Sequence, residues 1–367
     1  MPVSDHGFSG SYELGDVEFL LRRMEVAPLP TEERERLVGS GERHYSEMMG
    51  TEDRPSRERM QVFRECLRLN QGTLATDLVS LAHALNASAE GEELTLVSIA
   101  RAGTPIGVIV RKLLIERLGW TPGAVRHYSV SVIRDFGLDR AAMHHILARH
   151  SAASVRFIDG WTGKGTIATE VARSIRRDSR LYRHVDPGLW VPLDISGVSR
   201  WAANSEDYLL PLTVLGGTVS GLVSRSILRA EDRKVARWHG CAELSNLRKY
   251  DVSRWFVKHM TELGFDPSIR AREGHSENRV RAAECRSFIE ALISEFGLSD
   301  THGVKIGIGE AVRASLRRMP YRIMLRSLDS GDGLLVRRLA SLRGIPVEHR
   351  PDMPVTAAAL IKTSSLK

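Results

Sequence analysis

The fold of this chain is decided by the stretch Val155-Arg156-Phe157-Ile158-Asp159-Gly160-Trp161-Thr162-Gly163-Lys164-Gly165-Thr166. Its apolar run ends at an acid, Asp159, and a short Gly- and Thr-rich loop leads into a helical pattern from Ile167. This order predicts a β-strand, a tight loop and the N-terminus of an α-helix. Backbone N–H groups at a helix N-terminus suit a phosphate, and glycines allow its close approach. The loop is therefore either a phosphate-binding loop or an ordinary turn.

A second segment has the same order. Residues 94–100 form an apolar run, the turn Arg101-Ala102-Gly103-Thr104-Pro105 follows, and a helical pattern covers residues 108–118. With a third unit at residues 125–149, these segments predict an α/β fold with a parallel sheet. The first loop is not a nucleoside-triphosphate P-loop, because that motif needs a glycine where this chain has Ile158.

The two loops lie about 60 residues apart and resemble those of type I phosphoribosyltransferases, which bind phosphoribosyl diphosphate (PRPP). The acid and the following Thr-Gly-x-x-Thr pattern resemble the PRPP signature, and Arg101-Ala102-Gly103 resembles the diphosphate loop of the uracil-type members. The resemblance implies a Rossmann-like type I phosphoribosyltransferase domain.

Most of the chain beyond about residue 40 resembles the StiP family, which is found with bacterial tellurite-resistance and stress gene clusters. The matching stretches are residues 128–135, 159–165 and 218–225. This resemblance implies a smaller α/β/α Pelota-like domain of the RNA-binding type after the first domain. Members of the family have been labelled cysteine proteases.

The patterns divide the chain into an N-terminal arm at 1–50, a phosphoribosyltransferase domain at 51–265 and a Pelota-like domain at 276–367. Residues 196–250 are irregular and rich in Gly and Ser, as expected of a hood over a substrate. Helices are predicted at 56–69 and 73–85, separated at Gly72, and a strand at 190–194. Residues 266–277 are predicted to be a linker.

The composition, with 42% hydrophobic residues in 367, is that of a globular protein. There is no apolar run long enough to span a membrane and no signal-peptide pattern. Three scattered cysteines exclude a disulfide framework and a cysteine-rich metal cluster, so we expect a cytoplasmic protein. Of the net charge of +7, an excess of five lies after Ser276. This indicates either a polyanionic partner or a solvated surface.

The resemblance implies Mg²⁺- and PRPP-dependent phosphoribosyl transfer to, or diphosphorolysis from, an unidentified base or small-molecule nucleophile. Asp159 would accept hydrogen bonds from the ribose hydroxyls, although most relatives carry a second acid where this chain has Gly160. Mg²⁺ would be held mainly by the diphosphate, so no metal site made by the protein is expected. The residues implied to bind PRPP are Asp159, Gly160, Thr162, Gly163, Lys164, Gly165, Thr166, Arg101, Ala102 and Gly103.

Catalytic roles are predicted for Asp159, Arg101, Arg134 and Asp194. Arg134 follows a strand, where a mobile loop could bring its charge to the leaving group; an ordinary surface arginine is the alternative. Asp194 follows the strand at 190–194 and could orient the incoming nucleophile.

The predicted C-terminal domain contains a turn, residues 306–313, that resembles the RNA-contacting turn of the Pelota and kink-turn-binding group. Glu310 and Arg313 match that turn, whereas Gly309 stands where many members have Asn. Arg317 is a further candidate contact to RNA phosphates. The alternatives are an RNA-binding domain and a domain that has kept the fold but lost RNA binding.

Two other functions compete with the transferase. A cysteine protease needs a thiolate beside a positioned histidine, and the closest pair, His239 and Cys241, would not meet on a helix. A non-catalytic, PRPP-sensing, RNA-binding regulator is the main alternative. The sequence thus predicts a cytoplasmic phosphoribosyltransferase bound to PRPP and an acceptor, with a homodimer as one option for its assembly.

Overall fold

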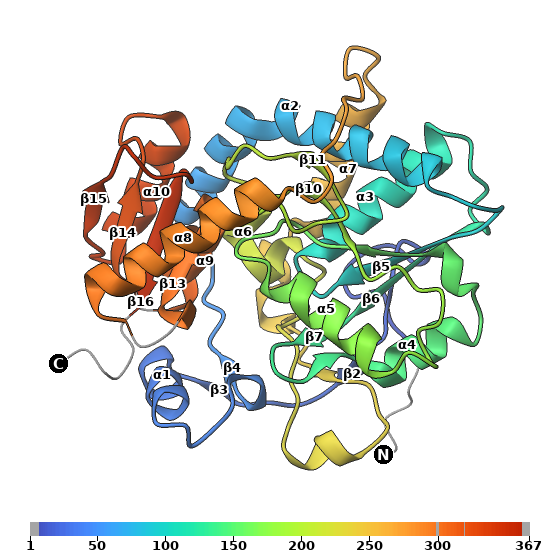
Figure 1. Ribbon diagram of the computed structural model, residues 1–367, viewed down its shortest axis with the longest axis horizontal. Coiled ribbons are helices and arrows are strands. Elements are labelled where there is room, and N and C mark those ends of the chain that lie inside the picture. The colour runs from blue at the N-terminus through green and yellow to red at the C-terminus, as the bar shows by residue number, and fades with distance from the viewer. Residues whose placement is uncertain (1–6, 299–300, 319, 362–367) are drawn as a thin grey trace.

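The centre of the molecule is a six-stranded parallel sheet, seen in a computed structural model that describes residues 7–298, 301–318 and 320–361 (Figure 1). The outermost residues of the predicted arm and C-terminal domain lie outside these ranges. The strands, in their order across the sheet, are β1 (Glu18–Phe19), β6 (Val125–Val130), β5 (Leu94–Ile99), β9 (Val155–Ile158), β10 (Leu189–Leu193) and β11 (Trp201–Asn204). The predicted α/β fold with a parallel sheet is confirmed.

Helices cover both faces of this sheet because alternate side chains of each strand point to opposite sides. In β5, Leu94 and Leu96 pack in one hydrophobic cluster, whereas Val97 and Ile99 pack in another. The first cluster contains residues of α2 (Arg57–Ala87), α3 (Gly103–Glu116) and α7 (Ser253–Phe265). The second contains residues of α4 (Arg140–Leu147) and α5 (Thr166–Arg177).

The C-terminal domain is a second α/β unit that packs against α2 (Figure 1). Its four strands have the order β13-β16-β14-β15, and β16 lies antiparallel to both of its neighbours. Its elements are α8 (Arg279–Phe296), β13 (Val304–Ile306), α9 (Ile308–Arg317), β14 (Pro320–Leu325), α10 (Gly331–Ser341), β15 (Val347–His349) and β16 (Ala357–Ile361).

Short elements complete the first domain. Two-stranded pairs are formed by β2 with β12, β3 with β4, and β7 with β8. Their bounds, with those of the two remaining α-helices, are β2 (Arg22–Arg23), β3 (Pro28–Leu29), α1 (Thr31–Gly39), β4 (Met49–Gly50), β7 (Val132–Ile133), β8 (Gly137–Leu138), α6 (Leu212–Leu215) and β12 (Gly240–Cys241). Among the helices described, none is long and apolar enough to cross a membrane.

Two local predictions need correction. Helix α2 runs unbroken through Gly72, because its buried face continues on both sides of that residue. Part of the predicted arm belongs to the core, since β1 pairs with β6 and Phe19 is fully buried. The two domains also share one hydrophobic cluster, which includes Trp161 and Leu210 on one side and Ile306 and Ile308 on the other.

Candidate functional site

The two predicted βα loops lie in contact at the carboxyl edge of the sheet. Strands β5 and β9 are neighbours, so the loops that follow them start side by side. A Cβ on Gly103 would lie 2.4 Å from the carbonyl oxygen of Ile158, and one on Gly160 would lie 3.0 Å from that of Ala102. The peptide bond between Ala100 and Arg101 is cis. The structure thus places the residues predicted to bind a diphosphate against those predicted to bind a phosphate.

Asp159 ends β9 and is buried, with 7% of its surface exposed. Its Oδ1 accepts a hydrogen bond of 2.7 Å from the backbone N–H of Gly160. Burial raises the pKa of Asp159 to about 7, although this hydrogen bond and the charge of Arg313 act in the opposite direction. Glu310 raises it further. The carboxyl group therefore changes its charge close to neutral pH.

The C-terminal domain covers the loop that follows Asp159. A Cβ on Gly163 would lie 3.0 Å from Cγ of Glu310, so the loop and the start of α9 touch. The Lys164 ammonium donates hydrogen bonds to the carbonyl oxygens of Thr301 and, at 3.3 Å, Val304. Beyond them, Gly165 adopts a φ of 79° and leads into α5, which starts at Thr166. A ligand at this loop would be enclosed between the two domains.

The same packing places the predicted RNA-contacting turn against the first domain. A Cβ on Gly309 would lie 3.3 Å from the indole of Trp161, and the guanidinium of Arg313 lies 5.2 Å above that ring. Arg313 also forms an ion pair of 2.8 Å with Glu310. The turn therefore packs against the first domain, while the side chains of Arg313 and Glu310 keep 37% and 27% of their surface exposed.

Asp194 has a structural role instead of the predicted catalytic one. Both of its oxygens accept hydrogen bonds from the loop that follows β10, and the Thr162 hydroxyl also donates to it. The loop donors are the backbone N–H groups of Ser196, Gly197, Val198 and Ser199 and the hydroxyls of Ser196 and Ser199. Burial would raise the pKa of Asp194, but these hydrogen bonds to its carboxylate hold the pKa below the usual value. No carboxylate oxygen is left to orient a nucleophile.

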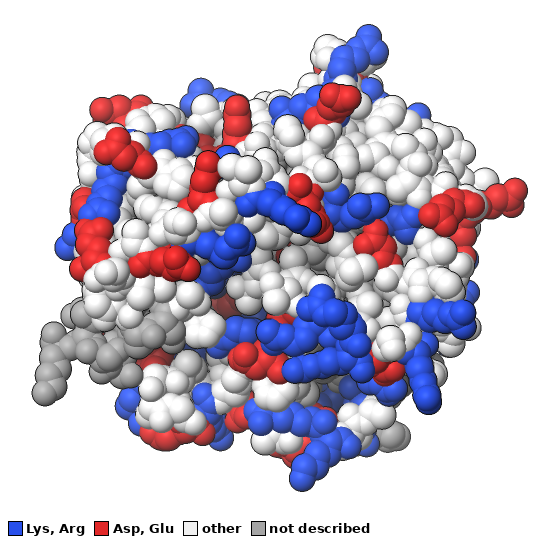
Figure 2. All heavy atoms as spheres, viewed as in Figure 1, with Lys and Arg blue, Asp and Glu red and all other residues white. Residues whose placement is uncertain are grey.

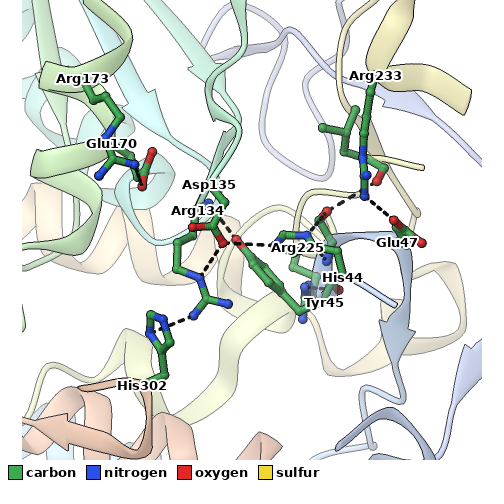
Figure 3. Close-up of polar contacts among 12 residues, drawn as sticks. His44, Tyr45, Glu47, Arg134, Asp135, Glu170, Arg173, Arg225, Arg233 and His302 are labelled. Atoms are coloured by element: carbon green, nitrogen blue, oxygen red, sulfur yellow. Dashed lines mark hydrogen bonds and ion pairs between the residues drawn. The ribbon is translucent and has the colours of Figure 1, made fainter. Parts of the chain in front are cut away.

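Arg134 lies where three parts of the chain meet (Figure 3). Its guanidinium is 4.9 Å from the ring centre of Tyr45, its Nε is 3.1 Å from Asp135, and its Nη1 is 3.2 Å from His302 of the C-terminal domain. Asp135 in turn lies 3.3 Å from His44. Arg134 thus connects the N-terminal segment, the β7–β8 turn and the C-terminal domain at the edge of the enclosed region.

A cluster of arginines around Glu52 was not predicted from the sequence. Arg101 forms an ion pair with Glu52, and a Cβ on Gly216 would lie 3.2 Å from Nη2 of Arg101 and 2.4 Å from Nη2 of Arg317. Burial of Glu52 would raise its pKa, but Arg101, Arg317 and Arg59 lower it to about 2. The carboxylate is therefore charged, and two guanidinium groups end beside one glycine.

Positive charge exceeds negative charge in this region. Burial together with Arg101 lowers the pKa of Arg317 well below the usual range, although the Glu52 carboxylate acts in the opposite direction. Burial, with Lys164 and Arg318, lowers the pKa of Lys305 to about 7. Figure 2 shows Lys and Arg side chains around a hollow between the C-terminal domain and α5. We call Asp159, Arg101, Glu52, Lys305, Arg313 and Arg317 the interdomain site.

The three cysteines lie away from this site and are buried. The exposed fractions are 0% for Cys66, 1% for Cys241 and 4% for Cys285. Burial raises the pKa of Cys241 to about 12, and His239 directs its Nδ1 to the Ser131 hydroxyl, 2.8 Å away. Within the described ranges, no histidine is hydrogen-bonded to a cysteine sulfur, and no group of three His, Cys, Asp or Glu residues could hold a metal.

Two protein families match the chain. Residues 10–261 match the family described as "Tellurite-like stress resistance cysteine protease StiP", and residues 283–363 match the "PELOTA RNA binding domain". The protein named "Cysteine protease StiP" from Acinetobacter baylyi (strain ATCC 33305 / BD413 / ADP1) is 37% identical over 372 residues, which cover 98% of this chain and 96% of that protein. No solved structure matches significantly.

These matches confirm the predicted kinship and the Pelota-like C-terminal domain, but they correct the predicted activity. Both the family description and the relative's name specify a cysteine protease. The prediction of a phosphoribosyltransferase, with the PRPP chemistry attached to it, is therefore wrong. The loops resemble those of the transferases because both kinds follow parallel strands and lead into helices, and that geometry does not define a reaction.

Proposed function

This chain belongs to the StiP family, and we propose that it binds a small ligand carrying phosphate groups in the interdomain site. The ligand would lie at the carboxyl ends of β5 and β9, where open parallel sheets bind ligands. The observation that carries the proposal is the convergence of Arg317 and Arg101, whose guanidinium groups end beside Gly216 and share the Glu52 carboxylate. Two cations beside one carboxylate leave an excess of positive charge, which an anionic ligand would balance.

The charges around this position favour an anion with more than one negative charge. Arg317 and Arg101 end beside Gly216, and Lys305 lies where Lys164 and Arg318 disfavour its charged form. A bound phosphate would stabilise each of these cations. Mg²⁺ remains a prediction of the resemblance, in which the phosphates of the ligand would mainly hold it.

We expect pyrophosphate and sulfate to bind the intact protein, and sulfate to bind about tenfold more tightly near pH 6 than near pH 8.5. As the pH falls through this range, Asp159 loses its negative charge and Lys305 gains a positive one, since both have a pKa of about 7. Isothermal titration calorimetry at low salt measures both affinities. Sulfate keeps its charge over this range, so its pH dependence reports the protein alone.

Two outcomes of this titration would contradict the proposal. One is the absence of binding at either pH, and the other is sulfate binding that strengthens as the pH rises. Both titrations, repeated with and without MgCl₂, test the predicted metal. Only a metal held by the ligand would change the affinity for pyrophosphate and leave the affinity for sulfate unchanged.

The second candidate is the cysteine protease activity in the relative's name, which the identity of 37% over nearly the whole chain favours. Cys241 is the cysteine nearest in sequence to a histidine, His239. A protease needs an accessible thiolate. Because Cys241 is buried in β12 with its pKa raised to about 12, the segment around it would have to open before it could act.

We expect iodoacetamide to leave all three cysteines of the native protein unmodified and to modify all three in denaturant, as read by intact-mass spectrometry. The reason is their burial, which raises the pKa of each thiol. Rapid native modification of Cys241 would contradict this result. The protease candidate would then be established if Cys241→Ser lost peptidase activity while Cys66→Ser and Cys285→Ser kept it.

A further inference from the structure

A group of arginines follows the exposed end of α5. Arg176 and Arg177 occupy its last turn, and Arg180 and Arg183 follow in the next turns; all four are exposed. Figure 2 shows Lys and Arg side chains crowding the surface over this helix. We propose that these four residues, here called the α5 arginine surface, bind the phosphate backbone of RNA.

The four side chains are not used by the protein itself. Within the described part of the chain none of them forms an ion pair, whereas their neighbours do: Arg173 pairs with Glu170, and Asp178 pairs with Arg140. The acids close to this surface are thus already paired with other arginines. Four unpaired guanidinium groups within eight residues of sequence give a local field that attracts a polyanion.

Helix stability explains only half of this surface. Arginines in the last turn of a helix interact favourably with its dipole, which accounts for Arg176 and Arg177. Arg180 and Arg183 lie beyond the end of the helix at Arg177, where this effect has faded. Helix stability therefore does not account for all four arginines, and a binding partner is needed to explain the whole group.

RNA fits this surface better than a membrane does. A membrane-bound helix inserts exposed apolar side chains, but the apolar residue between the arginines, Leu181, packs partly buried against the second core cluster. The C-terminal match to an RNA-binding domain supplies the independent indication of RNA. Since Glu310 and Gly309 of that domain's turn are packed against the first domain, we place the RNA on another surface.

We expect the full-length protein to bind a labelled single-stranded RNA of about 20 nucleotides at low salt, with affinity that falls steeply as salt rises. In the variant Arg176→Gln/Arg177→Gln/Arg180→Gln/Arg183→Gln the dissociation constant should rise at least about tenfold, and the slope of log affinity against log salt should fall by about 3. Fluorescence anisotropy across a salt series measures both quantities.

The matched control removes the same charge elsewhere. Arg64, Arg68, Arg279 and Arg286 are exposed on α2 and α8 and are likewise replaced by Gln. This control should keep nearly all of the RNA affinity and of the salt slope. An equal loss in both variants would show attraction to net charge alone and would overturn the assignment. The absence of RNA binding at low salt would also overturn the assignment. Tighter binding to anionic phospholipid vesicles or to duplex DNA than to RNA would overturn it as well.

Discussion

Replacing Arg317 by Met should weaken pyrophosphate binding at least about a hundredfold while making the ligand-free protein more stable by about 1 kcal/mol. The loss of affinity and the gain in stability have one cause, which is the charge of the Arg317 guanidinium. In the free protein the attraction of Glu52 for this guanidinium is outweighed by burial and by the charge of Arg101, so removing the charge relieves repulsion and desolvation. In the bound protein the same group would be paired with phosphate. Calorimetric titration measures the affinity, and thermal unfolding measures the stability.

Arg322→Met is the control for this experiment. Arg322 belongs to β14 of the same domain, forms an ion pair with Glu348 and lies outside the interdomain site. Its replacement should leave pyrophosphate affinity unchanged and should not raise the melting temperature. If Arg317→Met kept its affinity, the ligand would not lie at this arginine; if it lost stability, Arg317 would have a structural partner instead.

Much of the sheet could be predicted because its signals are local. Each strand–loop–helix unit places an apolar run, a turn and an amphipathic pattern within about 25 residues, as in 154–178. The contact between the two loops could also be predicted from the topology, because the carboxyl ends of parallel strands lie at the same edge of a sheet. Strand β16 was missed although Ala357–Ile361 is fully buried, because a short alanine-rich run has no period that distinguishes a strand from a helix.

The electrostatics of the site could not be predicted in the same way. Glu52, Arg101 and Arg317 come together from three distant segments, and their contact depends on how the C-terminal domain packs. The turn at 306–313 has a local signature, but no local pattern indicates that Trp161 packs against it. Asp194 was recognised as a strand-end acid, yet its hydrogen bonds come from a loop whose path only the structure shows. Local patterns thus identified the residues, and packing decided their roles.

Gly103→Ala should destabilise the protein by about 3 kcal/mol, which for a chain of this size lowers the melting temperature by about 5 °C or more. The added Cβ would lie 2.4 Å from the carbonyl oxygen of Ile158 and 3.0 Å from Cα of Asp159. Both are backbone atoms at the end of a central strand, so they cannot rotate away as a flexible side chain would. The start of α3 or the end of β9 has to shift.

Gly72→Ala makes the same chemical change with the opposite expected result. Gly72 lies inside α2, and no atom of a neighbouring element lies within 4 Å of a Cβ built on it. Alanine forms helices better than glycine by about 1 kcal/mol, so this variant should melt at a higher temperature than the parent protein.

The pair of glycine variants also separates folding from ligand binding. If the two loops form one site, the shift forced by Gly103→Ala should weaken pyrophosphate binding even at a temperature where the variant is fully folded, and Gly72→Ala should bind like the parent protein. A Gly103→Ala variant that is less stable but binds with unchanged affinity would show that the contact between the loops serves only packing. The anion would then have to be held by the arginines around Glu52 alone.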